Sequence, residues 1–155
     1  MSQTNNPEAV LGAQRLLNAS PKEVFSVFEQ PDRLARWWGP NGFTNTFETF
    51  EFKPGGLWKF VMHGPSGENG EPGTNYPNES VFKEIVPESR IVIEHICQPW
   101  FTLTINLTPK GNQTHLDWAQ EFESTEVARK IHSLIGDANE QNLDRMERVL
   151  AEARA

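Results

Sequence analysis

The chain has 155 residues, a formal net charge of −7 at pH 7 and a sequence pI near 5.1. This length is enough for one domain that buries a hydrophobic core without disulfides or a structural metal. The acidic balance argues against nucleic acid and against an anionic membrane surface, because both partners require a basic protein face.

The N-terminal segment is polar, so we expect residues 1–9 to be flexible and residues 10–153 to form one domain. No secretion signal is visible, and no apolar run approaches the ~18 residues that a membrane span requires. The single cysteine, Cys97, excludes an internal disulfide and suits a reducing compartment. Together these features favour a cytoplasmic location, with Cys97 as a buried, unreactive thiol in a strand.

Residues 10–18 predict a first strand, and the segment Ser20-Pro-Lys-Glu23 predicts the start of a helix. The serine can cap the free amides of the first turn, and the glutamate three residues later completes a capping box. After the next proline we expect Asp32 to cap a second short helix that runs to about Trp38.

From Phe43 to Phe122 the pattern is typical of β-structure. Segments rich in Phe, Val, Ile, Thr and Trp alternate with turns that contain Pro and Gly. The short connections favour an antiparallel meander over crossovers. The predicted strands cover residues 43–52, 57–63, 76–86, 90–97, 100–109 and 113–122.

After Phe122 the apolar residues recur at helical spacing. This segment predicts either a short helix followed by a long one or a single helix with a kink near Gly136. A long amphipathic helix must bury its apolar stripe, and the concave face of a curved sheet offers the place. We therefore predict an α+β fold in which a curved antiparallel sheet holds a long C-terminal helix, with two short helices after the first strand.

Aromatic residues are concentrated between residues 37 and 60, where eight of 24 residues are Phe or Trp. In the first strand of this region Phe43 and Phe47 have one parity, whereas Phe50 and Phe52 have the other. A β-bulge between the two pairs would bring all four rings to one face. These rings predict either a close-packed core or the wall of a chamber.

A curved sheet crossed by one helix leaves a gap at its open end that large side chains line without always filling. Trp37 and Trp38 stand before a turn, so one indole can pack into the core while the other faces the entrance. Tyr76, Glu79 and His95 would orient a ligand, although Glu79 and His95 can equally point outward into solvent. The predicted ligand-binding residues are Trp37, Trp38, Phe43, Phe60, Met62, Tyr76, Glu79, His95, Trp100 and Trp118.

Motifs for metal, cofactor or nucleophilic chemistry are not found. The four histidines are widely separated and there is no paired cysteine, so we expect no metal site. The sequence has no nucleophile elbow, P-loop or dinucleotide fingerprint, so no cofactor and no catalytic residue are predicted. An enzyme that acts on a hydrophobic substrate, with Glu79 or His95 as acid or base, remains an alternative, and it would need two titratable groups that face one cavity.

Four segments carry a resemblance to a known family: "SPKEVFSVFEQPDRLARWWGPNGF", "FKPGGLWKFVMHGPSG", "YPNESVFKEIVPESRIVIEH" and "NLDRMERVL". Across residues 10–152 the chain resembles the SRPBCC (START-like) superfamily, and within it the bacterial family homologous to the activator of the heat-shock-protein-90 ATPase. The resemblance implies a helix-grip fold with a cavity between sheet and helix. Superfamily members bind lipids, hormones or polyketides, and some catalyse cyclisation or dehydration.

The favoured interpretation is a protein, monomer or homodimer, that binds a small and largely apolar molecule, aromatic or lipid-like, in an internal cavity. The first alternative, implied by the family name, is a stress-response module that associates with a chaperone. Against this alternative, the acidic chain lacks the basic surface expected to bind an acidic chaperone face. The second alternative is the enzyme described above.

Overall fold

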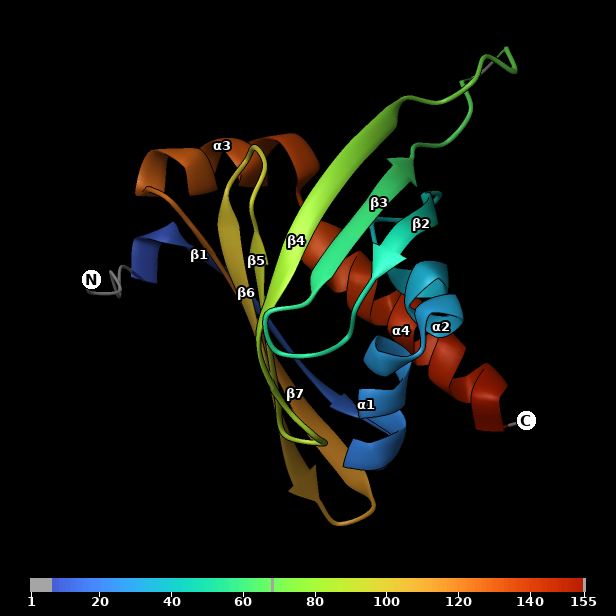
Figure 1. The fold of residues 1–155 in the computed structure, drawn as a ribbon, viewed down its shortest axis with the longest axis vertical. Coiled ribbons are helices and arrows are strands. Elements are labelled where there is room, and N and C mark those ends of the chain that lie inside the picture. The colour runs from blue at the N-terminus through green and yellow to red at the C-terminus, as the bar shows by residue number, and fades with distance from the viewer. Residues whose placement is uncertain (1–6, 68, 155) are drawn as a thin grey trace.

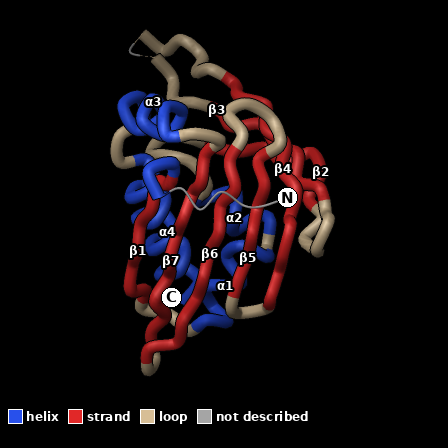
Figure 2. Tube along the Cα trace, turned by 90° about the vertical axis from the view of Figure 1, so that its left-hand side faces the viewer, coloured by secondary structure: helices blue, strands red, loops and turns tan. Residues whose placement is uncertain are grey.

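The computed structural model describes residues 7–67 and 69–154. The elements in chain order are η1 (Pro7–Ala9), β1 (Val10–Leu17), α1 (Pro21–Glu29), α2 (Pro31–Trp37), β2 (Thr44–Phe50), β3 (Leu57–His63), β4 (Asn75–Val86), β5 (Arg90–His95), β6 (Phe101–Lys110), β7 (Gln113–Phe122), α3 (Thr125–Ile135) and α4 (Ala138–Arg154). The strands form one antiparallel sheet in the order β1-β7-β6-β5-β4-β3-β2. The helices lie on one side of this curved sheet (Figures 1 and 2). The predicted α+β helix-grip architecture is confirmed.

The start of α1 follows the predicted capping box. Ser20 accepts a hydrogen bond from the Glu23 amide at 3.2 Å, and the Glu23 carboxylate accepts one from the Ser20 amide at 2.9 Å. The predicted cap of α2 is wrong, because Gln30 occupies the N-cap position and Asp32 lies in the first turn. Pro31 takes the first helical position, so the cap falls on the residue before it.

The predicted β-bulge is confirmed in β2. Its register with β3 shifts between Phe47 and Thr49, which turns Phe47 and Phe50 to the same face of the sheet. Both rings pack against the buried core, as does Phe52 just after the strand. The bulge therefore places these aromatic residues on the concave side, where the helices lie.

The C-terminal segment forms two helices, the first of the two alternatives. The chain turns between α3 and α4 at Gly136, whose φ of 54° lies in the left-handed region that favours glycine. α4 then crosses the concave side of the sheet (Figure 1). Its residues in the main hydrophobic core are Leu143, Met146, Val149 and Leu150.

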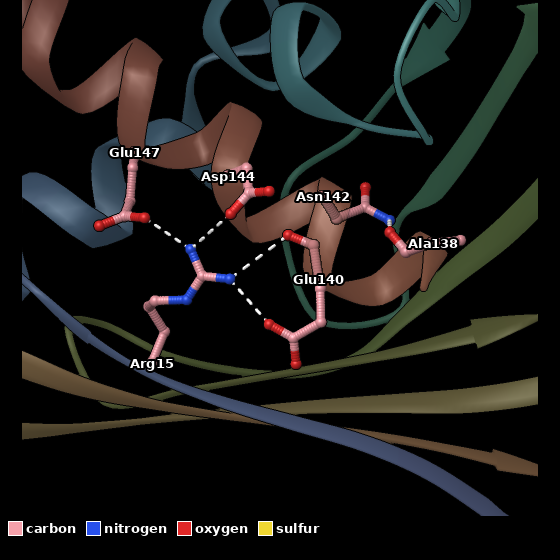
Figure 3. A network of polar contacts seen from close by, with 6 residues as sticks. All are labelled: Arg15, Ala138, Glu140, Asn142, Asp144 and Glu147. Carbon is pink, nitrogen blue, oxygen red and sulfur yellow. Dashed lines mark hydrogen bonds and ion pairs between the residues drawn. The ribbon is translucent and has the colours of Figure 1, made fainter. Parts of the chain in front are cut away.

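A polar network attaches α4 to the first strand (Figure 3). Arg15 of β1 forms ion pairs with Glu140 and Asp144, both under 3 Å, and with Glu147. These three carboxylates stand on one face of α4 because they are spaced four and three residues apart. Burial opposes the charge on Arg15, but hydrogen bonds to the three carboxylates outweigh it and raise the pKa of the guanidinium.

Replacing Arg15 by glutamine is expected to lower the free energy of unfolding by about 1–2 kcal/mol, since three half-exposed pairs contribute ~0.2–1 kcal/mol each. The three carboxylates would then repel one another without a cation between them. Urea unfolding measures the loss, which should shrink in 1 M salt because salt screens the repulsion. A variant as stable as the wild type at low salt would contradict this role of Arg15.

The N-terminal segment enters beside α3. Residues 1–6 of the segment expected to be flexible lie outside the described residues, and residues 7–9 form the short helix η1. Ala9 is buried, and η1 contacts α3. Among the helices that the structure describes, none is long and apolar enough to cross a membrane.

Candidate functional site

A partly open cavity of about 580 Å³ lies at one end of the sheet, beside the junction of α3 and α4 and the loop from α2 to β2. This volume is in the range of small-molecule sites, roughly 300–1,000 Å³. Aromatic and aliphatic side chains form most of its wall. The large apolar members are Trp38, Phe43, Phe60, Met62, Phe101, Leu103, Trp118, Phe122, Ile131 and Leu134.

Seven of the ten predicted ligand-binding residues line this cavity. They come from the loop after α2 and from strands β3, β4, β5 and β7, so residues far apart in sequence meet at one place. The structure therefore brings most of the predicted set together. The seven are Trp38, Phe43, Phe60, Met62, Tyr76, His95 and Trp118.

The other three predicted residues are not among the lining residues, which corrects their assignment. Trp37 is fully buried in the core, where its indole N–H donates to the Val27 carbonyl at 2.9 Å. Glu79 pairs with Lys59 of β3, whereas its neighbour Asn78 pairs with the cavity-lining Phe60, so the Glu79 side chain lies on the opposite face of the sheet. Trp100 is held elsewhere by a hydrogen bond of 2.8 Å from its indole N–H to Glu94.

The adjacent tryptophans separate because the backbone changes conformation between them. Trp37 is the last residue of α2, whereas Trp38 is extended, with φ −68° and ψ 130°. The two rings meet edge to face with centroids 5.6 Å apart. Trp38 turns toward the aromatic wall and packs on Trp58 at 5.0 Å. Trp37 thus fills the core, and Trp38 supplies a wall of the cavity.

Polar residues of α4 hold the loop that carries Trp38, a role that no pattern in the sequence predicted. The Arg145 guanidinium donates hydrogen bonds at 2.8–3.3 Å to five backbone carbonyls of this loop and of α2. Asn142 accepts from the Gly39 amide at 2.7 Å, and Gln141 accepts from the Asn41 amide at 3.0 Å. The carbonyl acceptors belong to Arg36, Trp38, Gly39, Pro40 and Phe43.

His95 is a buried polar residue of the cavity wall, and its ring stacks on Phe101 with centroids 4.5 Å apart. Nδ1 lies 2.7 Å from the Pro99 carbonyl, and Nε2 lies 2.6 Å from Asn78 Oδ1 and 3.3 Å from the Cys97 sulfur. Burial lowers the pKa of His95, and the hydrogen bond to Pro99 offsets only part of this effect. The imidazole is therefore neutral at pH 7, and since the Pro99 carbonyl and Asn78 Oδ1 are both acceptors, its single ring proton can serve only one of them.

The contact with Cys97 was not predicted, although side chains two residues apart share one face of a regular strand. β5 ends at His95, so the chain is free to turn and bring the sulfur beside the ring. Cys97 is half-buried, its thiol is free, and it is not among the cavity-lining residues.

Acidification is expected to destabilise the protein through His95. Its pKa is lower in the folded than in the unfolded chain, so the unfolded chain takes up the proton first as the pH falls below about 6.5. The stability present above that pH is then lost at up to ~1.4 kcal/mol per pH unit. Chemical unfolding between pH 5 and 8 would show a steeper loss for the wild type than for His95→Gln. Equal slopes would contradict the neutral buried ring.

The chemistry of the cavity is that of neutral groups. The described lining residues include no Asp, Glu, Lys or Arg. Since Glu79 faces away, Glu79 and His95 do not face each other across the cavity, and His95 is the one of the two that lines it. Within residues 7–67 and 69–154, no group of three His, Cys, Asp or Glu side chains is placed to hold a metal ion. The polar lining side chains are mostly amides: Asn75, Asn78, Gln98, Gln120, Asn139 and Asn142.

Comparison with known proteins gives a family and a set of similar structures. The family model described as Activator of Hsp90 ATPase homolog 1-like protein matches residues 18–151. A protein from Arthrobacter aurescens is similar at a TM-score of 0.82 and 25% identity, with 94% of this chain and 88% of that chain covered. No curated protein matches the chain.

Two more distant structures support the same fold. A protein from Nitrosomonas europaea has a TM-score of 0.82 at 21% identity, with 96% of this chain and 98% of that chain covered. An AHSA1-like protein from Aeromonas hydrophila has a TM-score of 0.69 at 13% identity, with 92% and 94% covered. At these identities the likeness is one of fold.

Proposed function

Because the chain belongs to the Activator of Hsp90 ATPase homolog 1-like family, whose fold commonly binds hydrophobic ligands, we propose that it binds a small, largely apolar molecule in the cavity beside α4. The observation that carries this proposal is that α4 crosses the hollow of the sheet and leaves about 580 Å³ open at one end. Aromatic and aliphatic surface surrounds that space, and burial of apolar surface is the main source of affinity for such ligands.

The aromatic residues supply contact area and ring packing. Trp38, Phe60 and Trp118 line the cavity from different elements. Aromatic pairs contribute ~0.5–1.5 kcal/mol each beyond the area that they bury. Leu134 is 69% exposed although it lines the cavity, so α3 places an apolar side chain at the mouth, where a ligand would cover it. The proposed site therefore has apolar surface both inside and at its entrance.

A titration with N-phenyl-1-naphthylamine tests this proposal. The probe is neutral and aromatic, and its emission rises when it enters an apolar site. We expect a saturable rise with one probe bound per chain. Absence of saturation with well-folded protein would overturn the proposal.

Two variants of β3 locate the bound probe. Met62→Trp adds bulk inside the cavity and is expected to weaken binding at least about tenfold, which a loss of ~1.4 kcal/mol produces. Val61→Trp adds the same bulk on the opposite face of the strand and should leave binding unchanged. Equal affinities for the two variants would place the probe elsewhere on the protein. Thermal unfolding of both variants controls for loss of the fold.

Chaperone association is the second proposal, and it rests on the family description alone. In a cytoplasmic setting the partner would be an Hsp90-type ATPase. The test is the ATPase rate of a bacterial Hsp90 with and without this protein. An unchanged rate at saturating concentration would overturn this second proposal and leave the cavity proposal intact.

A further inference from the structure

Two buried polar atoms of the cavity wall have no hydrogen-bond partner among the described residues. They are the indole N–H of Trp118, a residue that is only 2% exposed, and the side-chain oxygen of Gln120. Both residues line the cavity. Buried polar groups in native proteins almost always have a partner, and one left without it is costly. The unpaired donor and acceptor therefore indicate a partner that comes from outside the chain.

The geometry of β7 places the unpaired donor of Trp118 and the unpaired acceptor of Gln120 close together. Residues 118 and 120 are two apart in the strand, so their side chains share one face, with Cα atoms about 7 Å apart. A single ligand group that both accepts and donates can therefore form hydrogen bonds with both side chains. Trp58 and Asn45 also carry an unpaired buried atom, but neither residue lines the cavity.

The charge of the wall excludes an ionic group as that partner. The described lining residues carry no Lys or Arg to pair with a carboxylate, and no Asp or Glu to pair with an ammonium. His95 is neutral, and both of its ring nitrogens already have neighbours within the chain. An ion that entered would lose its water without gaining a counter-charge, which strongly opposes binding.

Resting on the proposed function, we infer that the cavity selects an uncharged ligand with a carboxamide or hydroxyl group on an apolar body. That group accepts a hydrogen bond from Trp118 Nε1 and donates one to Gln120 Oε1. The apolar body lies against the aromatic wall formed by Trp38 and Phe60. Fatty-acid carboxylates, which share the apolar body, are rejected by their charge.

Four naphthalenes of nearly equal shape test this inference by isothermal titration calorimetry at pH 7.5. 2-Naphthamide offers both an acceptor and a donor, 2-acetylnaphthalene only an acceptor, 2-isopropylnaphthalene neither, and 2-naphthoate a negative charge. We expect 2-naphthamide to bind about three- to tenfold tighter than 2-acetylnaphthalene, the range that one net hydrogen bond gives. We expect 2-naphthoate to bind the weakest of the four.

Variants of β7 assign the effect to the two side chains. Gln120→Met should weaken 2-naphthamide by about three- to tenfold and leave 2-acetylnaphthalene and 2-isopropylnaphthalene unchanged. Trp118→Phe removes the donor and should weaken 2-naphthamide and 2-acetylnaphthalene alike. Glu121→Met, on the opposite face of the same strand, is the matched control and should change none of the affinities. Because Gln120 is only half-buried, its variant remains informative even if Trp118→Phe fails to fold.

The outcomes separate this inference from the proposed function. If all four compounds bind with equal affinity, or if Gln120→Met changes nothing, the inference is overturned and the apolar binding site remains. Tight binding of 2-naphthoate would also overturn it. If none of the four binds, the inference and the proposed function fall together.

Discussion

Replacing Arg145 by methionine is expected to lower the free energy of unfolding by about 2–4 kcal/mol, because four part-buried carbonyls lose their donor at once. Arg145 donates to five carbonyls of α2 and the loop that follows it, and this loop carries Trp38. Methionine keeps much of the apolar stem of the side chain but offers no hydrogen bond. Urea unfolding, followed by circular dichroism, measures the loss.

The matched control for this prediction is Arg148→Met. Arg148 lies in the same helix one turn later and is exposed, so its removal should change stability by less than about 0.5 kcal/mol. The Arg145 variant should also bind N-phenyl-1-naphthylamine more weakly, since the released loop forms part of the cavity wall. Equal stability of the two variants would show that the carbonyls are satisfied without Arg145.

Replacing Trp37 by alanine is expected to cost about 3–5 kcal/mol of stability, the usual range for a large aromatic residue removed from a core. The ring is fully buried, packs on Phe28 with centroids 5.1 Å apart, and donates a hydrogen bond to Val27. Thermal and urea unfolding measure the loss.

Two other tryptophans serve as comparisons. Trp38→Ala should cost less than Trp37→Ala, because Trp38 already borders open space, but it should weaken probe binding more strongly. Trp100→Ala should stay within about 1 kcal/mol of the wild type, since it loses one hydrogen bond and no cavity contact. If the first two variants are equally destabilised with equal probe affinity, the division of roles between the adjacent tryptophans is wrong.

Local signals in the sequence were sufficient for most elements of the fold. The Ser20–Glu23 capping box and the change of parity between Phe47 and Phe50 are short-range patterns with one physical reading each. The apolar residues that recur at helical spacing after Phe122 likewise have to be buried against another element, and the curved sheet provides that surface. The cap predicted at Asp32 was wrong because Pro31 occupies the first helical position, which makes Gln30 the N-cap.

The site was only partly predictable because it depends on register and on contacts between distant residues. A glutamate at position 79 does not indicate on which face of the sheet its side chain lies, because that face is fixed by the pairing of β4 with its neighbours. Arg145 contacts a loop more than 100 residues away, and no local pattern marks such a contact. The pair formed by His95 and Cys97 depends on where β5 ends.

The most direct test follows the indole N–H signals of the five tryptophans by two-dimensional NMR while 2-naphthamide is added. We predict that the Trp118 signal moves furthest and that Trp38 follows, whereas Trp37 and Trp100 keep their positions. A titration that leaves Trp118 and Trp38 unmoved, or that moves Trp100 instead, would contradict a ligand site in the hollow beside α4.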